Sequence, residues 1–164
     1  MDFNLEEIST AEIIQLYSNS IKELKRREII RTNNVTGDLG EYLAIKYYNE
    51  TPNLPNLQPA PVGTTNIDAI SRNGERYSIK STTTNTTGVF YGLEPKGSQN
   101  KDIQKFEYVI ICCFDKDYAL LEILEMDWNT FIENKRWHSR MNAWNLNLSK
   151  KIKEKCNLIY SKKI

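Results

Sequence analysis

Proline, glycine, histidine and cysteine are all scarce in this chain of 164 residues. With 5 Pro and 7 Gly among 40% hydrophobic and 26% charged residues, the chain as a whole is neither collagen-like nor disordered. The 3 Cys include the adjacent pair Cys112 and Cys113 but no Cys-x-x-Cys motif, so we expect reduced, buried thiols rather than disulfides. The single His, His138, belongs to no Cys–His cluster, which argues against zinc. The length favours one domain over residues 1–164.

Long apolar runs are also missing. The longest is Tyr108–Phe114, whereas a membrane-spanning helix needs about 20 residues. The acidic N-terminus lacks the basic and apolar regions of a secretory signal. We therefore expect a cytoplasmic protein with no membrane partner.

The net charge of +1 conceals an uneven distribution. The C-terminal segment 135–164 contains nine Lys or Arg and one acid, Glu154, which leaves the first 134 residues with a net charge of −7. A basic end on an acidic body is typical of a protein that presents one face to a polyanion, and equally of a solvated lysine-rich tail.

Hydrophobic periodicity predicts helices over about 10–30, after a Ser9–Glu12 capping box, and over 36–49. The basic residues at the end of the first helix, among them Arg31, suit its dipole. A surface loop is expected over 51–65, a short helix after Asp127, and strands over 66–71, 76–81, 88–92, 107–114, 118–125 and 157–160. The nearly all-apolar strand 107–114 should be central. Together these elements predict an α/β or α+β domain, a mixed sheet flanked by helices.

The second helix contains an acid in an unusual position. Glu41 shares a helix face with Ile45 and Tyr48, while a second apolar stripe occupies the opposite side. We therefore expect the Glu41 carboxylate to be partly buried beside a partner, the alternative being a tilted helix with Glu41 at its wet edge.

The segments 66–71 and 76–81 flank an Asn73-Gly74 bend, which is a strong hairpin signal. A two-residue loop would place Asp68 opposite Ile79, on the wrong face. A three-residue loop over 72–74, with Gly74 in the left-handed conformation, places Asp68 opposite Ser78, with Lys80 next on the same face. We predict the three-residue loop.

Such an Asp–Lys pair, within reach of a helical Glu, is suited to hydrolysis of phosphodiesters. Carboxylates can hold Mg²⁺, the metal can activate water and stabilise phosphate charge, and a neighbouring lysine can orient or deprotonate that water. The sequence here resembles the PD-(D/E)XK nuclease superfamily, the fold of many type II restriction endonucleases. The resemblance covers about 30–125 and lies in Gly40-Glu41-Tyr42, Asn66-Ile67-Asp68-Ala69 and Tyr77-Ser78-Ile79-Lys80-Ser81.

The resemblance implies a restriction-endonuclease-like fold and a role for each of these residues. Asp68 would be a metal ligand, Ile79 would contribute its backbone carbonyl, Lys80 would position or deprotonate water, and Glu41 would be a helical acid near the site. Ser78 departs from the pattern because it stands where the family has its second acid. Some members supply that acid about fourteen residues after the lysine, which is Glu94 here, so Glu41 and Glu94 are alternative replacements.

DNA contacts are expected from two segments. Hydroxyl and amide groups follow the catalytic strand at Ser81, Thr82, Thr83, Thr84 and Asn85. Cations mix with aromatic residues at Lys135, Arg136 and Arg140, near Trp137 and Trp144. An exposed turn-forming loop and core tryptophans are the alternatives.

The sequence thus predicts a Mg²⁺-dependent endodeoxyribonuclease, with Mn²⁺ as a possible substitute. It would be a type II restriction enzyme that cuts double-stranded DNA as a homodimer, because one site cuts one strand and a palindrome is met by two-fold symmetry. The alternative is a non-catalytic DNA-binding or protein-interaction module that keeps the nuclease fold. A third hypothesis is nicking of branched or damaged DNA.

Overall fold

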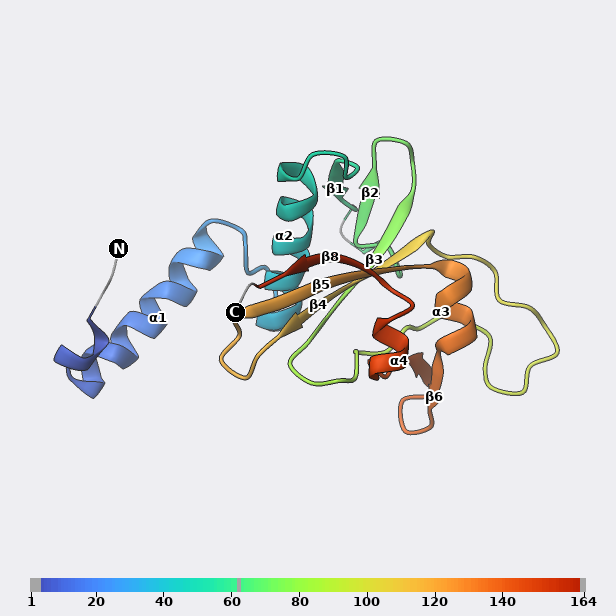
Figure 1. The fold of residues 1–164 in the computed structure, drawn as a ribbon. Coiled ribbons are helices and arrows are strands. Elements are labelled where there is room, and N and C mark those ends of the chain that lie inside the picture. Colours follow the sequence, from blue (N-terminus) through green and yellow to red (C-terminus); the bar gives the residue numbers. More distant parts are fainter. Residues whose placement is uncertain (1–3, 62, 163–164) are drawn as a thin grey trace.

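The computed structural model describes residues 4–61 and 63–162, which form a mixed β-sheet flanked by helices (Figure 1). The six-stranded sheet has the order β1-β2-β3-β4-β5-β8. Its strands are β1 (Leu57–Pro59), β2 (Ala69–Ser71), β3 (Arg76–Thr82), β4 (Tyr108–Phe114), β5 (Leu120–Asp127) and β8 (Asn157–Ser161). Only β3 and β4 pair in parallel, and the other neighbours are antiparallel. The predicted mixed sheet with flanking helices is confirmed.

Strand β4 occupies the middle of the sheet and separates two hydrophobic cores. Alternate residues point to opposite faces, so Ile110 and Cys112 join one core while Val109 and Ile111 join the other. This explains why the strand is apolar at almost every position, as predicted for a central strand. The buried thiols of Cys112 and Cys113 are free cysteines, as expected.

Helix α2 (Val35–Glu50) covers the first of these cores. Asn34 caps it by accepting a hydrogen bond of 3.1 Å from the N–H of Gly37. Ala44 and Tyr48 pack against Tyr77 and Ile79 of β3. The bounds agree with the helix predicted over 36–49, and the packing places Glu41 near one end of the β2–β3 hairpin.

Helix α1 (Thr10–Arg26) begins at the predicted Ser9 capping box but ends earlier than the predicted Ile30. Its last turn closes as a Schellman motif, in which the N–H of Ile29 donates to the carbonyl of Leu24 at 3.0 Å and Glu28 adopts a left-handed φ of 59°. Arg31 therefore lies outside the helix, and the assignment of Arg31 to the α1 dipole is wrong. Among the described residues, no helix has the length and hydrophobicity needed to cross a bilayer.

The remaining elements cover the opposite face of the sheet. They are α3 (Trp128–Asn134), the hairpin of β6 (Arg136–His138) and β7 (Ala143–Asn145), and α4 (Lys150–Lys153). The structure bears out α3 and β8 but corrects two predictions. The expected strand over 88–92 is reduced to one bridge between Phe90 and Trp144, and the expected loop over 51–65 contains β1. Each of the unpredicted strands has only three residues, too few for periodicity to reveal.

Candidate active site

The β2–β3 hairpin has the predicted three-residue loop. Ala69 pairs with Tyr77 and Ile70 with Arg76, which leaves 72–74 as the loop once Ser71 N–H donates to the carbonyl of Glu75 at 2.9 Å. Gly74 adopts a φ of +86°, the left-handed conformation on which the prediction depended. Continuing this register places Asp68 opposite Ser78.

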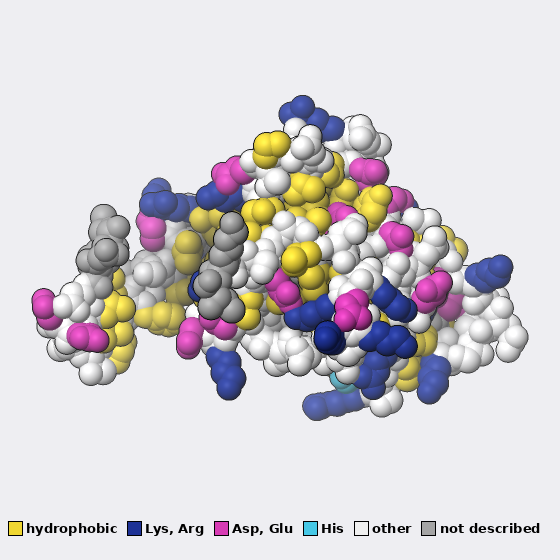
Figure 2. All heavy atoms as spheres, viewed as in Figure 1, with side chains coloured by type: hydrophobic (Ala, Val, Ile, Leu, Met, Phe, Trp, Pro, Cys, Tyr) yellow, Lys and Arg dark blue, Asp and Glu magenta, His cyan; other side chains and the backbone are white. Residues whose placement is uncertain are grey.

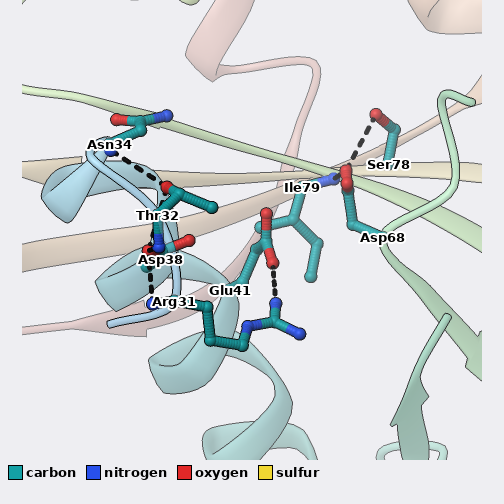
Figure 3. Close-up of polar contacts among 8 residues, drawn as sticks. All are labelled: Arg31, Thr32, Asn34, Asp38, Glu41, Asp68, Ser78 and Ile79. Carbon is teal, nitrogen blue, oxygen red and sulfur yellow. Dashed lines mark hydrogen bonds and ion pairs between the residues drawn. The ribbon is translucent and has the colours of Figure 1, made fainter. Parts of the chain in front are cut away.

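The Asp68 side chain continues the pairing of β3 beyond the end of β2. β2 begins at Ala69, so at Asp68 a side-chain carboxylate, and not a strand backbone, accepts the hydrogen bond from β3. Oδ2 of Asp68 accepts a hydrogen bond of 2.6 Å from the N–H of Ile79 and a longer one of 3.4 Å from Oγ of Ser78 (Figure 3). The Asp68 backbone is fixed too, since its N–H donates to Tyr77 at 2.8 Å. The carboxylate is thus held in place against β3.

Lys80 follows Ser78 on the same face of β3, as predicted. Its Nζ lies 5.0 Å from the centre of the Phe90 ring, in a cation–π contact. Phe90 in turn pairs with β7, because its N–H donates to the carbonyl of Trp144 at 2.6 Å. Lys80 is therefore positioned by Phe90, which in turn pairs with β7.

Glu41 reaches the same site from α2 on the other face of the sheet (Figure 3). Its side chain is 25% exposed, and its carboxylate accepts a hydrogen bond of 2.7 Å from the guanidinium of Arg31. Burial and then the negative charge of Asp68 raise the pKa of Glu41, while the charges of Arg31 and Lys80 act in the opposite direction. The prediction of a partly buried Glu41 with a partner is confirmed.

Arg31 and Asp38 also belong to this site, although sequence reasoning missed both roles. Asp38 is 5% exposed, and its Oδ2 accepts hydrogen bonds from the backbone N–H groups of Arg31 at 2.7 Å and Thr32 at 2.6 Å. These bonds fix the segment before α2, so that the Arg31 side chain can reach Glu41. An acid in the first turn of a predicted helix was the available signal for Asp38, since such acids often bind free N–H groups.

A cavity of about 380 Å³ opens beside these residues. Its lining combines Asp68 and Glu41 with Arg31, Asp38 and the segment around Ala60 and Thr64. A second hollow of about 390 Å³ shares Arg31, Asp38 and Glu41 and extends along α2 to Asn49. Both hollows therefore meet at the Arg31–Glu41 ion pair, where a ligand could reach the carboxylates.

The candidate metal ligands at this site are the carboxylates of Asp68 and Glu41, which line the same cavity. Within 4–61 and 63–162, no group of three or more His, Cys, Asp or Glu side chains could hold a metal ion. Asp68 and Glu41 supply two carboxylates, and the charge of Asp68 raises the pKa of Glu41, a repulsion that a divalent cation would relieve. Mg²⁺ commonly binds through one or two carboxylates and keeps several waters. Two carboxylates are thus a donor set that Mg²⁺ can accept, with water as the remaining ligands.

Glu94, the alternative acid, occupies a different environment. Its carboxylate accepts a hydrogen bond from Ser98, and its backbone N–H donates to Asp102 at 2.7 Å. Its carbonyl accepts a hydrogen bond of 2.7 Å from the indole N–H of Trp144. In the described part of the chain, none of these bonds joins Glu94 to Asp68 or Lys80. The structure brings Glu41, and not Glu94, together with Asp68.

Of the residues expected to contact DNA at the end of β3 and just after it, some point inward. Oγ of Ser81 is buried under α2 and has no hydrogen-bond partner among the described residues. Thr82 is buried and donates to the carbonyl of Thr86 at 2.7 Å. Exposed side chains at this turn are those of Thr83, Thr84 and Asn85.

The basic residues around β6 likewise include one that is engaged within the protein and two that are exposed. Lys135 forms an ion pair with Asp102, and its Nζ lies 4.2 Å from the centre of the Trp144 ring. Its side chain is only 9% exposed, so it is engaged within the protein. Arg136 and Arg140 remain exposed. Trp137 and Trp144 pack edge to face with ring centres 5.1 Å apart.

No protein-family model matches the sequence, and the comparison with curated proteins finds no match either. The main parts of the site are the carboxylates of Asp68 and Glu41, which line an open cavity, and Lys80, which follows Ser78 on β3.

Proposed function

We propose that the protein is a Mg²⁺-dependent endodeoxyribonuclease of the PD-(D/E)XK type. One observation carries this proposal: Asp68 lies opposite Ser78, so that Lys80 follows on the same face, while Glu41 approaches from α2. A carboxylate pair can hold a divalent cation, the cation can activate a water, and a neighbouring lysine can orient that water. The open cavity next to Asp68 and Glu41 provides access.

Each residue has a defined part in this proposal. Asp68 and Glu41 would hold Mg²⁺, with the backbone carbonyl of Ile79 as a further ligand. When bound, the ion supplies neutralisation of phosphate charge and a lower pKa for water. Lys80 would orient the attacking water or accept its proton, for in-line displacement at the phosphorus of the scissile phosphodiester.

The serine at position 78 makes Glu41 essential to this assignment. Ser78 is fully buried and forms a hydrogen bond with Asp68, so it supports the first carboxylate without adding a second. Arg31 neutralises Glu41 in the structure, at 2.7 Å. An incoming cation would compete with this guanidinium, which could then turn to a phosphate oxygen.

The substrate that this arrangement favours is double-stranded DNA. Figure 2 shows Lys and Arg side chains gathered where Figure 1 places α4 and β6. Arg136 and Arg140 are exposed on the β6–β7 hairpin, which pairs with Phe90, and Phe90 contacts Lys80. A polyanion bound to this hairpin would therefore extend toward the site. Cutting both strands at a palindrome, as a type II restriction enzyme does, would require two copies of the chain.

Nicking of supercoiled plasmid in Mg²⁺ tests the proposal. We expect Asp68→Asn and Lys80→Gln each to lower the rate by about 100-fold or more, because each removes a group in contact with the reacting atoms or the cation. Matched controls are Asp115→Asn, a carboxylate that likewise accepts backbone N–H bonds of 2.9 Å, and Lys116→Gln in the same exposed turn. Equal nicking by all five proteins would identify a contaminant and exclude the proposal.

A non-catalytic DNA-binding module is the second candidate. The observation in its favour is that the described residues contain no cluster of three acidic or other metal-binding side chains. Such a module would retard plasmid DNA on a gel but leave it uncut in both Mg²⁺ and Mn²⁺. Retardation without cleavage, unchanged by Asp68→Asn, would favour this candidate over the nuclease.

A further inference from the structure

The cavity beside Asp68 has a strong imbalance of charge. Three carboxylates line it, those of Asp38, Glu41 and Asp68. Arg31 is the only basic residue among the described residues of the lining, so three negative charges face one positive charge. A net charge of this sign repels a phosphate. The approach of a nucleic-acid phosphate is therefore favourable only after the charge has been compensated.

The backbone of Arg31 is held firmly, whereas its side chain is free to turn. The backbone N–H groups of Arg31 and Thr32 donate to the buried carboxylate of Asp38 at 2.7 and 2.6 Å. The Arg31 side chain is 44% exposed, and among the described residues its guanidinium makes one hydrogen bond, from Nη2 to Oε2 of Glu41 at 2.7 Å (Figure 3). Ion pairs as exposed as this one are weak. The guanidinium can thus leave Glu41 while its anchor stays in place.

Arg31 also lies where three hollows meet. Besides the cavities of about 380 and 390 Å³, it lines a larger one of about 890 Å³. That hollow adds Lys25, Thr32 and Asn33, all exposed, against one acid, Glu28. Once the guanidinium leaves Glu41, all its N–H groups can bind a phosphate, which it can do through two parallel hydrogen bonds.

We propose that Arg31 couples the binding of a divalent cation to the binding of DNA. This inference rests on the proposed function. In the metal-free protein, Arg31 neutralises Glu41 and is withheld from phosphate. When Glu41 and Asp68 bind a divalent cation, the cavity reaches charge balance, and Arg31 releases Glu41 and donates to a phosphate oxygen. The cation and DNA therefore each strengthen the binding of the other.

Calorimetric titration with Mn²⁺ in the absence of DNA tests the competition for Glu41. Arg31→Gln should bind Mn²⁺ at least about threefold more tightly than the wild type, because it removes a cation that pairs with Glu41. The matched control is Arg27→Gln, which removes an equal charge from a 2.8 Å ion pair with Glu23 and should leave the affinity unchanged. An unchanged or weaker affinity of Arg31→Gln would overturn the inference alone. A wild type that binds no Mn²⁺ would remove the proposed function as well.

Fluorescence anisotropy with a labelled DNA duplex tests the release of Arg31 to phosphate. The background is Lys80→Gln, which keeps both carboxylates and suppresses cleavage. In Mn²⁺, adding Arg31→Gln should weaken DNA binding at least about tenfold, as loss of a hydrogen bond to a charged group does. Adding Arg31→Lys should restore only part of the affinity, because lysine lacks the planar fork.

The same titration without a metal separates this role from a general effect of charge. There Glu41 engages Arg31, so the loss on adding Arg31→Gln should be at least about threefold smaller than in Mn²⁺. Arg27→Gln should change DNA binding by one factor in both conditions. If Arg31→Gln weakens binding equally with and without Mn²⁺, or not at all, Arg31 does not couple the two ligands.

Discussion

The carboxylate of Asp68 accepts a hydrogen bond of 2.6 Å from the backbone N–H of Ile79, one residue before Lys80. This bond anchors the acid to the strand that carries the lysine, so neither group depends on a flexible loop for its position. Because β2 is shorter than β3, the Asp68 carboxylate, and not a strand backbone, accepts this bond. The site therefore lies where β3 has no paired strand on the side of β2. A phosphate could approach the edge there without displacing a paired strand.

The repulsion between Glu41 and Asp68 should be measurable directly. Burial and the charge of Asp68 raise the pKa of Glu41, and Arg31 lowers it. Asp68→Asn should therefore lower the Glu41 pKa, while Arg31→Gln should raise it. Carboxyl-carbon NMR titration of the metal-free protein measures both changes, with Asp115→Asn as the control. Shifts in the same direction for both variants would contradict this electrostatic account.

The raised pKa also predicts a pH dependence of stability. An acid that is more easily protonated when folded contributes stability below its unfolded pKa of about 4.5, and the contribution is lost as pH rises through the folded pKa. Glu41→Gln should remove this dependence, so the difference in free energy of unfolding between variant and wild type should change above pH 4.5. Urea unfolding at a series of pH values checks it. A constant difference across the series would show that Glu41 is not electrostatically strained.

Close packing of α2 on β3 predicts the effect of substitutions at Gly40 and Ser81. A Cβ at Gly40 would lie 1.8 Å from Oγ of Ser81, so Gly40→Ala should destabilise the protein by about 1–3 kcal/mol. Ser81→Ala removes a buried hydroxyl that has no partner among the described residues, so it should be neutral or stabilising. The double variant should therefore lose less than Gly40→Ala alone in urea unfolding. Strict additivity would show that the two residues do not meet.

The left-handed conformation of Gly74 predicts a difference in stability between two glycine variants. Gly74→Ala should cost about 1–2 kcal/mol, because Gly74 has a φ of +86° and a side chain there is strained. No atom lies within 4 Å of a Cβ built at Gly74, so the loss should be purely conformational. Gly88→Ala is the matched control, since it has the same open surroundings without a positive φ. Equal unfolding midpoints for the two variants would argue against the three-residue loop.

The hairpin register could be predicted because a local rule decides it. Only a left-handed residue at the third loop position places Asp68 opposite Ser78, and Gly74 provides that residue. Partial burial of Glu41 followed from helix periodicity in the same way. The first prediction rests on the residues of one turn, and the second on the spacing of apolar residues within one helix.

The contacts of Arg31 and Lys135 could not be predicted, because they depend on tertiary structure. Helix α1 ends with Glu28 in a left-handed conformation, a role usually filled by glycine or asparagine, so the sequence carries no stop signal. Lys135 pairs with Asp102, 33 residues away, and a charge pattern cannot reveal such a distant partner. Its engagement within the protein removes one expected DNA contact and leaves Arg136 and Arg140.

Calorimetric titration with Mn²⁺ tests most directly whether Asp68 and Glu41 share a divalent cation. The wild type should bind the ion, and Asp68→Asn and Glu41→Gln should each weaken binding at least about tenfold, since loss of a group that only supports a metal ligand already costs that much. Asp115→Asn should bind like the wild type. If all four proteins bind Mn²⁺ with the same affinity, or none binds it, the two carboxylates do not form a metal centre and the nuclease proposal fails.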